Sequence, residues 1–82
     1  MTNPRNPNHI DQHIGRYLRQ LRKDASMTQT DLADSLGVTF QQIQKYERGT
    51  NRISASRLYA ICQVFDKMPN DFFNIEETSK VA

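Results

Sequence analysis

Apolar residues through the middle of the chain recur every three or four positions, which is the spacing of one face of an α-helix. The first such segment runs from about residue 11 to residue 24, where Ile10, Ile14, Leu18 and Leu21 form one stripe. No segment alternates between apolar and polar residues at every second position, as a half-buried strand does. The pattern therefore predicts an all-α fold.

Four further helices follow with the same periodicity, over residues 29–36, 40–48, 55–65 and 70–73. Each of the first four of the five helices begins at a residue favoured at the N-cap, where the side chain accepts a hydrogen bond from the first helical turn. These expected N-caps are Asp11, Thr28, Thr39 and Ser54. The sequence therefore predicts five short helices around one core.

Residues 29–48 hold two short helices that are joined through Gly37. Glycine adopts the left-handed conformation at low cost, so it ends the first helix and turns the chain. Ala33 lies four residues before the glycine and is small enough to let the two helices cross closely and steeply. This geometry is that of a helix-turn-helix, whose second helix is able to enter the major groove of DNA.

The second helix of this pair has one polar face that predicts contact with bases. At about 100° per residue, its buried side is centred near Ile43. The exposed residues are expected to be Phe40, Gln41, Gln44, Lys45 and Arg48. In the major groove, glutamine pairs with adenine, lysine donates to guanine, and an aromatic ring contacts a thymine methyl group. The alternative is an ordinary solvated helix face.

The chain has 82 residues, of which 37% are hydrophobic and 24% charged, so it is long enough for one small globular domain. The net charge of +2 is uneven, because residues 1–57 hold nine basic and five acidic residues while residues 58–82 are net acidic. A basic first part indicates a polyanionic partner, with solvated helix faces as the alternative. We expect a flexible arm over residues 1–9, the helical domain over residues 10–75 and a tail over residues 76–82.

Several absences limit the classes of function. No apolar stretch approaches the ~18 residues of a membrane span, and no apolar signal region opens the sequence. The single cysteine, Cys62, cannot form an internal disulfide. We therefore expect a cytoplasmic protein with no membrane partner. His9 and His13 have a spacing that suits metal ligands but lack a third ligand nearby, and no catalytic motif is present, so no metal, cofactor or enzyme activity is predicted.

Taken together, the motifs resemble the phage repressor/Cro-type family of helix-turn-helix regulators, also called Xre-like. The resemblance covers about residues 10–75 and rests on Ile14-Gly15-Arg16, Leu21-Arg22, Met27-Thr28-Gln29, Leu32-Ala33, Leu36-Gly37-Val38, Ile43, Tyr46-Glu47-Arg48-Gly49 and residues 54–73. It implies a compact five-helix, lambda-repressor-like domain that binds a double-stranded DNA operator.

The resemblance also implies a role for each residue at a matching position. Base contacts are expected from Thr39, Phe40, Gln41, Gln44 and Lys45. Phosphate contacts are expected from Gln29, Asn51 and Arg52, together with Arg48 on the exposed face. Gln29 matches a glutamine that also braces the second helix of the pair. Arg22 and Glu47 match a structural ion pair between the first and third helices.

The end of the domain carries the expected homodimer contacts, which are Phe72, Phe73 and Ile75. One helix contacts only about 4–5 base pairs, so a two-fold dimer on a near-palindromic operator is expected. Two departures from the family pattern are Ala55, where some relatives have a basic residue, and Asp66, where many have glycine. The sequence shows no added sensor domain, so no small-molecule effector is expected.

Three functions fit these features. The first is a dimeric transcriptional regulator, and specifically a repressor. The second is the antitoxin of a toxin–antitoxin pair, which binds a toxin protein and regulates its own promoter. The third is an adaptor that binds only protein, although a basic, glutamine-rich helix is less suited to that role than an apolar one.

Overall fold

The computed structural model describes residues 8–75, so the predicted tail and residues 1–7 of the predicted arm lie outside the described residues. The described residues form four α-helices and one 3₁₀ helix, with no strand among them. In chain order these are α1 (His9–Asp24), α2 (Gln29–Leu36), α3 (Phe40–Arg48), α4 (Ala55–Phe65) and η1 (Pro69–Phe73). The predicted all-α fold is confirmed, with four α-helices instead of five. No helix of this part of the chain is long and apolar enough to cross a membrane.

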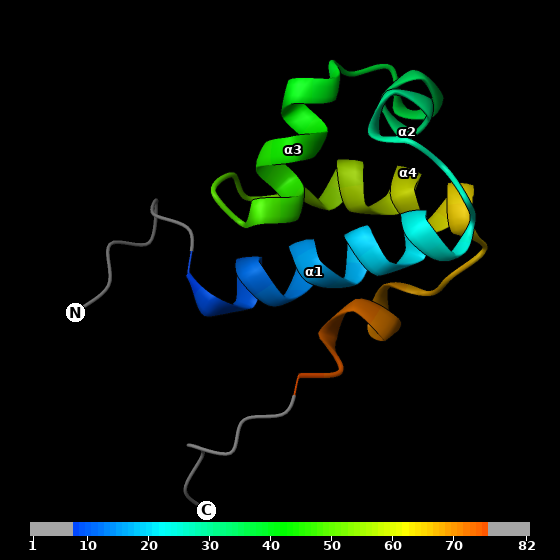
Figure 1. Ribbon diagram of the computed structural model, residues 1–82. Coiled ribbons are helices and arrows are strands. Elements are labelled where there is room, and N and C mark those ends of the chain that lie inside the picture. The colour runs from blue at the N-terminus through cyan, green and yellow to red at the C-terminus, as the bar shows by residue number, and fades with distance from the viewer. Residues whose placement is uncertain (1–7, 76–82) are drawn as a thin grey trace, which may run out of the picture.

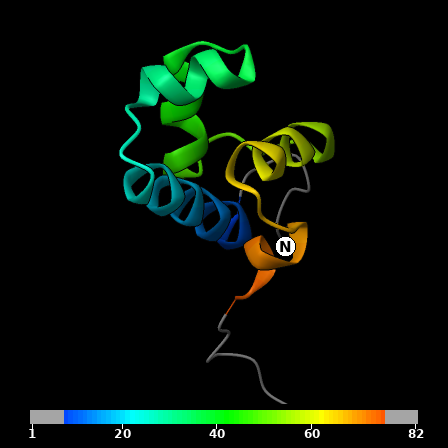
Figure 2. The ribbon, with the colours of Figure 1, turned by 90° about the vertical axis from the view of Figure 1, so that its right-hand side faces the viewer.

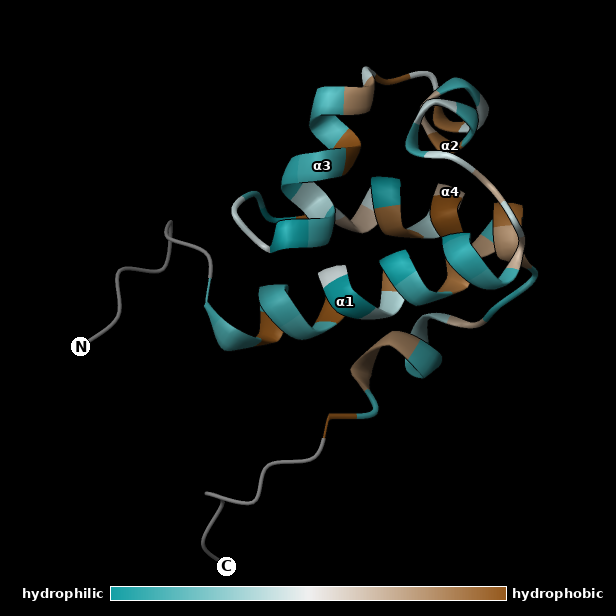
Figure 3. Cartoon of the chain, viewed as in Figure 1, coloured by the Kyte–Doolittle hydropathy of each residue, from teal (hydrophilic) through white to brown (hydrophobic). Residues whose placement is uncertain are grey.

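The helix α1 lies between η1 on one side and α3 on the other (Figure 1). The view at 90° shows the same arrangement, with α2 farthest from η1 (Figure 2). Every element contributes one large, fully buried side chain to a single core, and these are Leu18, Leu32, Ile43, Ile61 and Phe72. The apolar stripes predicted from the helical spacing therefore meet in one core, as the hydrophobic colouring of the inward helix faces shows (Figure 3).

The first helix begins two residues earlier than the sequence predicts. Asn8, and not Asp11, is its N-cap, because the Asn8 side chain accepts hydrogen bonds from the backbone N–H groups of Ile10 (2.9 Å) and Asp11 (3.3 Å). Asp11 occupies the reciprocal position and accepts from the Asn8 backbone N–H at 2.8 Å. Asn8 and Asp11 are both good capping residues, and three positions separate them, so local sequence does not decide which of them is the cap.

The other predicted N-caps are confirmed. Thr28 and Asp31 form a capping box at the start of α2, with hydrogen bonds of 2.9 and 3.0 Å. Thr39 caps α3 and Ser54 caps α4 through their hydroxyl groups. These caps fix where α2 and α3 begin, and therefore how much chain is left for the turn between them.

The left-handed turn predicted at Gly37 is also present, with φ of 71°. Gly49 ends α3 with φ of 74°. Asp66 takes the same left-handed conformation at the end of α4, with φ of 55°. A short polar side chain tolerates this conformation better than most, so aspartate replaces the glycine of the family pattern without loss of the turn.

The predicted fifth helix is a single short 3₁₀ segment that begins at Pro69. Its backbone N–H at Asp71 donates to the carbonyl of Met68, three residues earlier. Phe72 from this segment is fully buried and packs edge-on against Tyr17, with ring centroids 4.8 Å apart and planes at 90°. Phe72 therefore closes the protomer core and is not available to the predicted dimer surface.

The helices α1 and α3 pack closely against each other at two glycines. A Cβ atom on Gly15 would lie 2.2 Å from the carbonyl oxygen of Tyr46 and 2.9 Å from that of Glu47. A Cβ atom on Gly49 would lie 2.6 Å from the Cα atom of Gln12. Both glycines are therefore required for space, and the two close contacts fix the position of α3 on α1.

Candidate nucleic-acid interface

One face of α3 is buried and the opposite face is open to solvent. Ile43, Tyr46 and Glu47 lie at 0%, 7% and 6% exposure, so they anchor the helix to the core. Most of the α3 ribbon carries the hydrophilic colour, and its hydrophobic segment is turned toward α2 and α4 (Figure 3). The residues predicted to contact bases occupy the open face: Thr39, Phe40, Gln41 and Lys45 are exposed and Gln44 is half-buried.

The N-terminal end of α3 combines polar and apolar groups. Phe40, the first residue of the helix, is 43% exposed, so its ring is open to contact with another molecule. The hydroxyl of Thr39 accepts a hydrogen bond from the backbone N–H of Gln42 at 3.2 Å, so part of its hydrogen-bonding capacity serves the cap. This end of the helix is suited to van der Waals contact with a methyl group on a base.

The turn between α2 and α3 holds the two helices in a steep crossing (Figure 1). Ala33 is 2% exposed, and its carbonyl accepts the backbone N–H of Val38 at 3.0 Å. Arg57, on α4, donates from Nη1 to the carbonyl of Leu36 at 2.9 Å. The alanine–glycine geometry was predicted from the sequence, whereas the arginine clamp from α4 lies 21 positions away and had no local signal.

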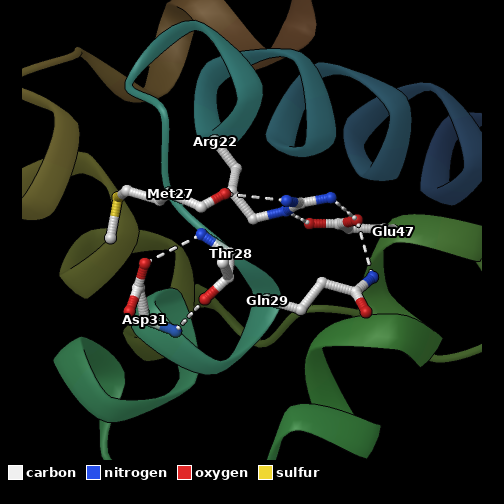
Figure 4. Close-up of polar contacts among 6 residues, drawn as sticks. All are labelled: Arg22, Met27, Thr28, Gln29, Asp31 and Glu47. Carbon is white, nitrogen blue, oxygen red and sulfur yellow. Dashed lines mark hydrogen bonds and ion pairs between the residues drawn. The ribbon is translucent and has the colours of Figure 1, made fainter.

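A buried ion pair joins the end of α1 to α3 (Figure 4). Arg22 Nε lies 2.6 Å from Glu47 Oε2, Arg22 Nη2 donates to Glu47 Oε1 at 3.1 Å, and Nη1 donates to the carbonyl of Met27 at 2.9 Å. The side chains are 10% and 3% exposed. The hydrogen bond to Glu47 raises the pKa of the Arg22 guanidinium further above its ordinary value, against the opposing effect of burial. The predicted pair therefore ties α3 to the first helix.

Gln29, the first residue of α2, joins the same cluster. Its side-chain amide Nε2 donates to Glu47 Oε1 at 3.1 Å (Figure 4). The bracing contact that the resemblance implied is thus made to the carboxylate of the ion pair. The side chain is only half-buried, so one side of it faces solvent next to α3.

The loop after α3 carries the other predicted phosphate contacts. Asn51 is partly exposed, and the side chain of Arg52 is 42% exposed. The guanidinium of Arg52 donates to the carboxylate of Asp11, from Nη2 at 3.1 Å and from Nε at 3.2 Å. Arg52 therefore holds the loop to the start of α1, which sequence reasoning missed because the two residues are 41 positions apart.

The expected dimer residues divide between the core and the surface. Phe73 is 50% exposed and Ile75 is partly exposed, in contrast to the buried Phe72. Three further apolar side chains that the sequence did not single out are open to solvent, with Tyr59 at 65%, Val64 at 37% and Met68 at 67%. Exposed apolar side chains therefore lie on α4, on η1 and on the segment that joins them.

The remaining candidates for chemistry do not come together. Residues 8–75 contain no group of three or more His, Cys, Asp or Glu side chains placed to hold a metal ion. Cys62 is buried at 3% exposure on α4, and burial raises the pKa of its thiol. A thiol with a raised pKa holds less of the reactive thiolate, so it is not an activated nucleophile.

These features define a helix-turn-helix domain: a steep α2–α3 pair, braced by a buried ion pair, with a polar face of α3 turned outward. The helix-turn-helix family model HTH_3 matches residues 18–72, and the chain belongs to this family. The resemblance to phage repressor/Cro-type regulators is thereby confirmed.

Curated relatives carry names that agree with the family. An uncharacterized HTH-type regulator of Sinorhizobium fredii, y4wC, is 48% identical over 69 residues, covering 84% of this chain and 48% of the relative. A transcriptional regulator in the ATPase CF(0) region of Rhodospirillum rubrum is 54% identical over 65 residues, covering 79% and 59%. Antitoxin PezA of Streptococcus pneumoniae is 32% identical over 78 residues, covering 83% and 49%. The chain spans about half the length of the curated relatives it matches.

Solved structures show the same fold. The restriction-modification controller protein C.AhdI of Aeromonas hydrophila superposes with a TM-score of 0.75 at 24% identity, covering 80% of this chain and 100% of that one. The biofilm regulator SinR, solved in complex with DNA, gives a TM-score of 0.66 at 27% identity, covering 74% and 98%.

Proposed function

We propose that the chain is the sequence-specific, double-stranded-DNA-binding part of a transcriptional regulator, and that the regulator acts as a repressor. The observation that carries this proposal is the outward face of α3, where Gln41 and Lys45 are exposed beside the half-buried Gln44. An α-helix fits the major groove, and glutamine and lysine have the donors and acceptors that distinguish base pairs there. The family and the DNA complex of SinR support the same conclusion.

Base contacts and phosphate contacts have different roles in binding. Thr39, Phe40, Gln41, Gln44 and Lys45 select the sequence. Gln29, Arg48, Asn51 and Arg52 set the position of the domain on the DNA backbone. The guanidinium of Arg52 also donates to Asp11, so a phosphate contact from Arg52 is made beside this ion pair.

We propose further that two copies bind a near-palindromic operator. A single α3 contacts too few base pairs for useful specificity, and a two-fold dimer places two such helices in successive major grooves about 34 Å apart. Phe73 and Ile75 supply apolar surface for the dimer contact, and the exposed Tyr59 on α4 adds to that surface. A regulator of this kind works on the chromosome in the cytoplasm.

The test compares affinities for a preferred duplex and a random duplex. Lys45→Ala and Gln41→Ala are each expected to reduce the difference in binding free energy between the two duplexes, and so the ratio of their affinities, by roughly 1–3 kcal/mol. The fold is expected to stay intact because both side chains are exposed. Lys67→Ala, which removes an exposed charge between α4 and η1, is the matched control and leaves the ratio unchanged. Equal losses on both duplexes for Lys45→Ala contradict the base-contacting role.

A second candidate function rests on the relative PezA, which is named as an antitoxin. In that case the chain binds a toxin protein, and its binding to DNA regulates its own promoter. Purification of the protein with and without the product of the neighbouring gene distinguishes the two, because only an antitoxin forms a stable complex with that product.

A further inference from the structure

Arg19 on α1, which is not among the motif residues that carry the resemblance to the family, shares a cleft with Arg48 on α3. The cleft has a volume of about 340 Å³ and lies where α1, the start of α2 and α3 meet. Its lining residues are Arg19, Gln29, Gln44, Glu47 and Arg48. Arg19 is exposed to solvent on α1.

The electrostatics of the cleft favour an anion. Glu47 is the one carboxylate in the lining, and both of its oxygens are already bound, Oε2 by Arg22 and Oε1 by Arg22 and Gln29. Neither Arg19 nor Arg48 forms an ion pair with any carboxylate of residues 8–75. Two exposed guanidinium groups from different helices therefore line one cleft, and no carboxylate of residues 8–75 pairs with either of them.

The basic character continues along α1. A second hollow of about 190 Å³ is lined by Arg16, Arg19, Gln20 and Lys23. Within it, Gln20 donates a hydrogen bond to Asp24 at 2.8 Å, and the three basic side chains are exposed. These basic side chains of α1 draw a polyanion toward the cleft.

The position of the cleft identifies the anion. A helix with its side chains is about 10–12 Å wide and the major groove is about 12 Å wide, so a helix in the groove has DNA backbone along each flank. Gln44 and Arg48 belong to α3, and the cleft opens directly beside them. A backbone phosphate on that flank therefore lies next to both arginines.

We propose that Arg19 and Arg48 bind one phosphate of the DNA backbone together, with the Gln29 amide at the floor of the cleft. This inference rests on the proposed function, since the phosphate belongs to the duplex that α3 enters. Guanidinium groups bind phosphate oxygens with paired hydrogen bonds, so two of them from separate helices fix both the position and the direction of the strand. Arg19 thus makes α1 part of the DNA-binding surface.

The first experiment measures the salt dependence of binding to a random-sequence duplex of 30 base pairs for wild type, Arg19→Ala, Arg19→Lys and Lys67→Ala. Both guanidinium groups are needed to hold the shared phosphate, so Arg19→Ala is expected to lose this contact, to reduce the slope of log K against log salt by about 0.9, and to weaken binding about eightfold at 0.1 M salt. Arg19→Lys keeps the charge and retains most of the slope. Lys67→Ala removes the same charge far from the cleft and leaves the slope unchanged. A slope for Arg19→Ala equal to that of Lys67→Ala overturns the inference.

A double variant tests whether the two arginines share one phosphate. If they do, Arg19→Ala combined with Arg48→Ala costs less than the product of the two single fold-losses. Independent losses that multiply overturn the shared site. The melting temperatures of all variants are expected to match wild type, because both side chains are exposed and neither has an ion pair within residues 8–75.

Failure of the proposed function can be told apart from failure of this inference by the behaviour of the wild-type protein. If the wild-type protein binds no duplex, the proposed function fails. The cleft is then tested with inorganic phosphate alone, by following the NMR signals of the Nε–Hε groups of Arg19 and Arg48. Paired shifts of both signals support an anion site in the cleft, and the absence of shifts overturns this inference as well.

Discussion

Removing one side of the buried ion pair between Arg22 and Glu47 is expected to cost more free energy than removing both. Arg22→Met leaves a carboxylate that is 3% exposed with only the amide of Gln29 as a donor. An unpaired buried charge of this kind costs about 3–5 kcal/mol. The whole chain has a free energy of unfolding of roughly 4–12 kcal/mol at 0.05–0.15 kcal/mol per residue. The single change therefore removes much of the stability.

The double variant Arg22→Met/Glu47→Leu removes both charges and leaves apolar side chains in their place. It is expected to be more stable than Arg22→Met, because no buried charge remains unpaired. Urea denaturation at pH 7 of wild type, both single variants and the double variant gives the coupling energy. At about 4–8 °C per kcal/mol for a domain of this size, the melting temperature of Arg22→Met falls by roughly 12–40 °C. If the losses of the two single variants add up to the loss of the double variant, the pair does not act as a unit and the reasoning is refuted.

Two further predictions concern the fold. Gly15→Ala is expected to destabilise the protein by about 1–3 kcal/mol in urea denaturation, because the new Cβ atom would lie 2.2 Å from the Tyr46 carbonyl oxygen; a stability at or above wild type contradicts the close α1–α3 contact. The backbone and hydroxyl of Thr28 hold the pKa of Asp31 below its ordinary value of 3.8, so the stabilisation from this capping box is present above that value and is lost as the pH falls through the lowered pKa. Thermal unfolding measured between pH 5 and about pH 2 checks this. The melting temperature of Asp31→Asn is expected to fall less over this range than that of wild type, because asparagine does not titrate. The same fall for both proteins contradicts the prediction.

Features that depend on near neighbours in the sequence could be predicted. The apolar stripes, the Thr28 and Thr39 caps and the left-handed Gly37 all follow from residues within one or two helical turns. The same periodicity placed Gln41 and Lys45 on the open face of α3. These predictions rest on the geometry of a single helix, which relates residues only a few positions apart.

Features that depend on distant packing could not be predicted. The Arg52 guanidinium lies on Asp11, and Phe72 packs on Tyr17, because the ends of the domain fold against α1. Hydrophobicity alone leaves an aromatic residue near the end of a domain equally suited to the core or to a partner. The cleft beside α3 is a further example, because Arg19 and Arg48 line one space only when α1 and α3 are packed together.

The central claim is that the exposed face of α3 selects a DNA sequence. It is tested most directly by selecting bound duplexes from a random pool with wild type and with Gln41→Ala. We expect wild type to enrich an inverted repeat whose half-sites lie one helical turn apart, and Gln41→Ala to lose the preference at one position of each half-site. Enrichment of no sequence by wild type, or the same sequence enriched by both proteins, contradicts the claim.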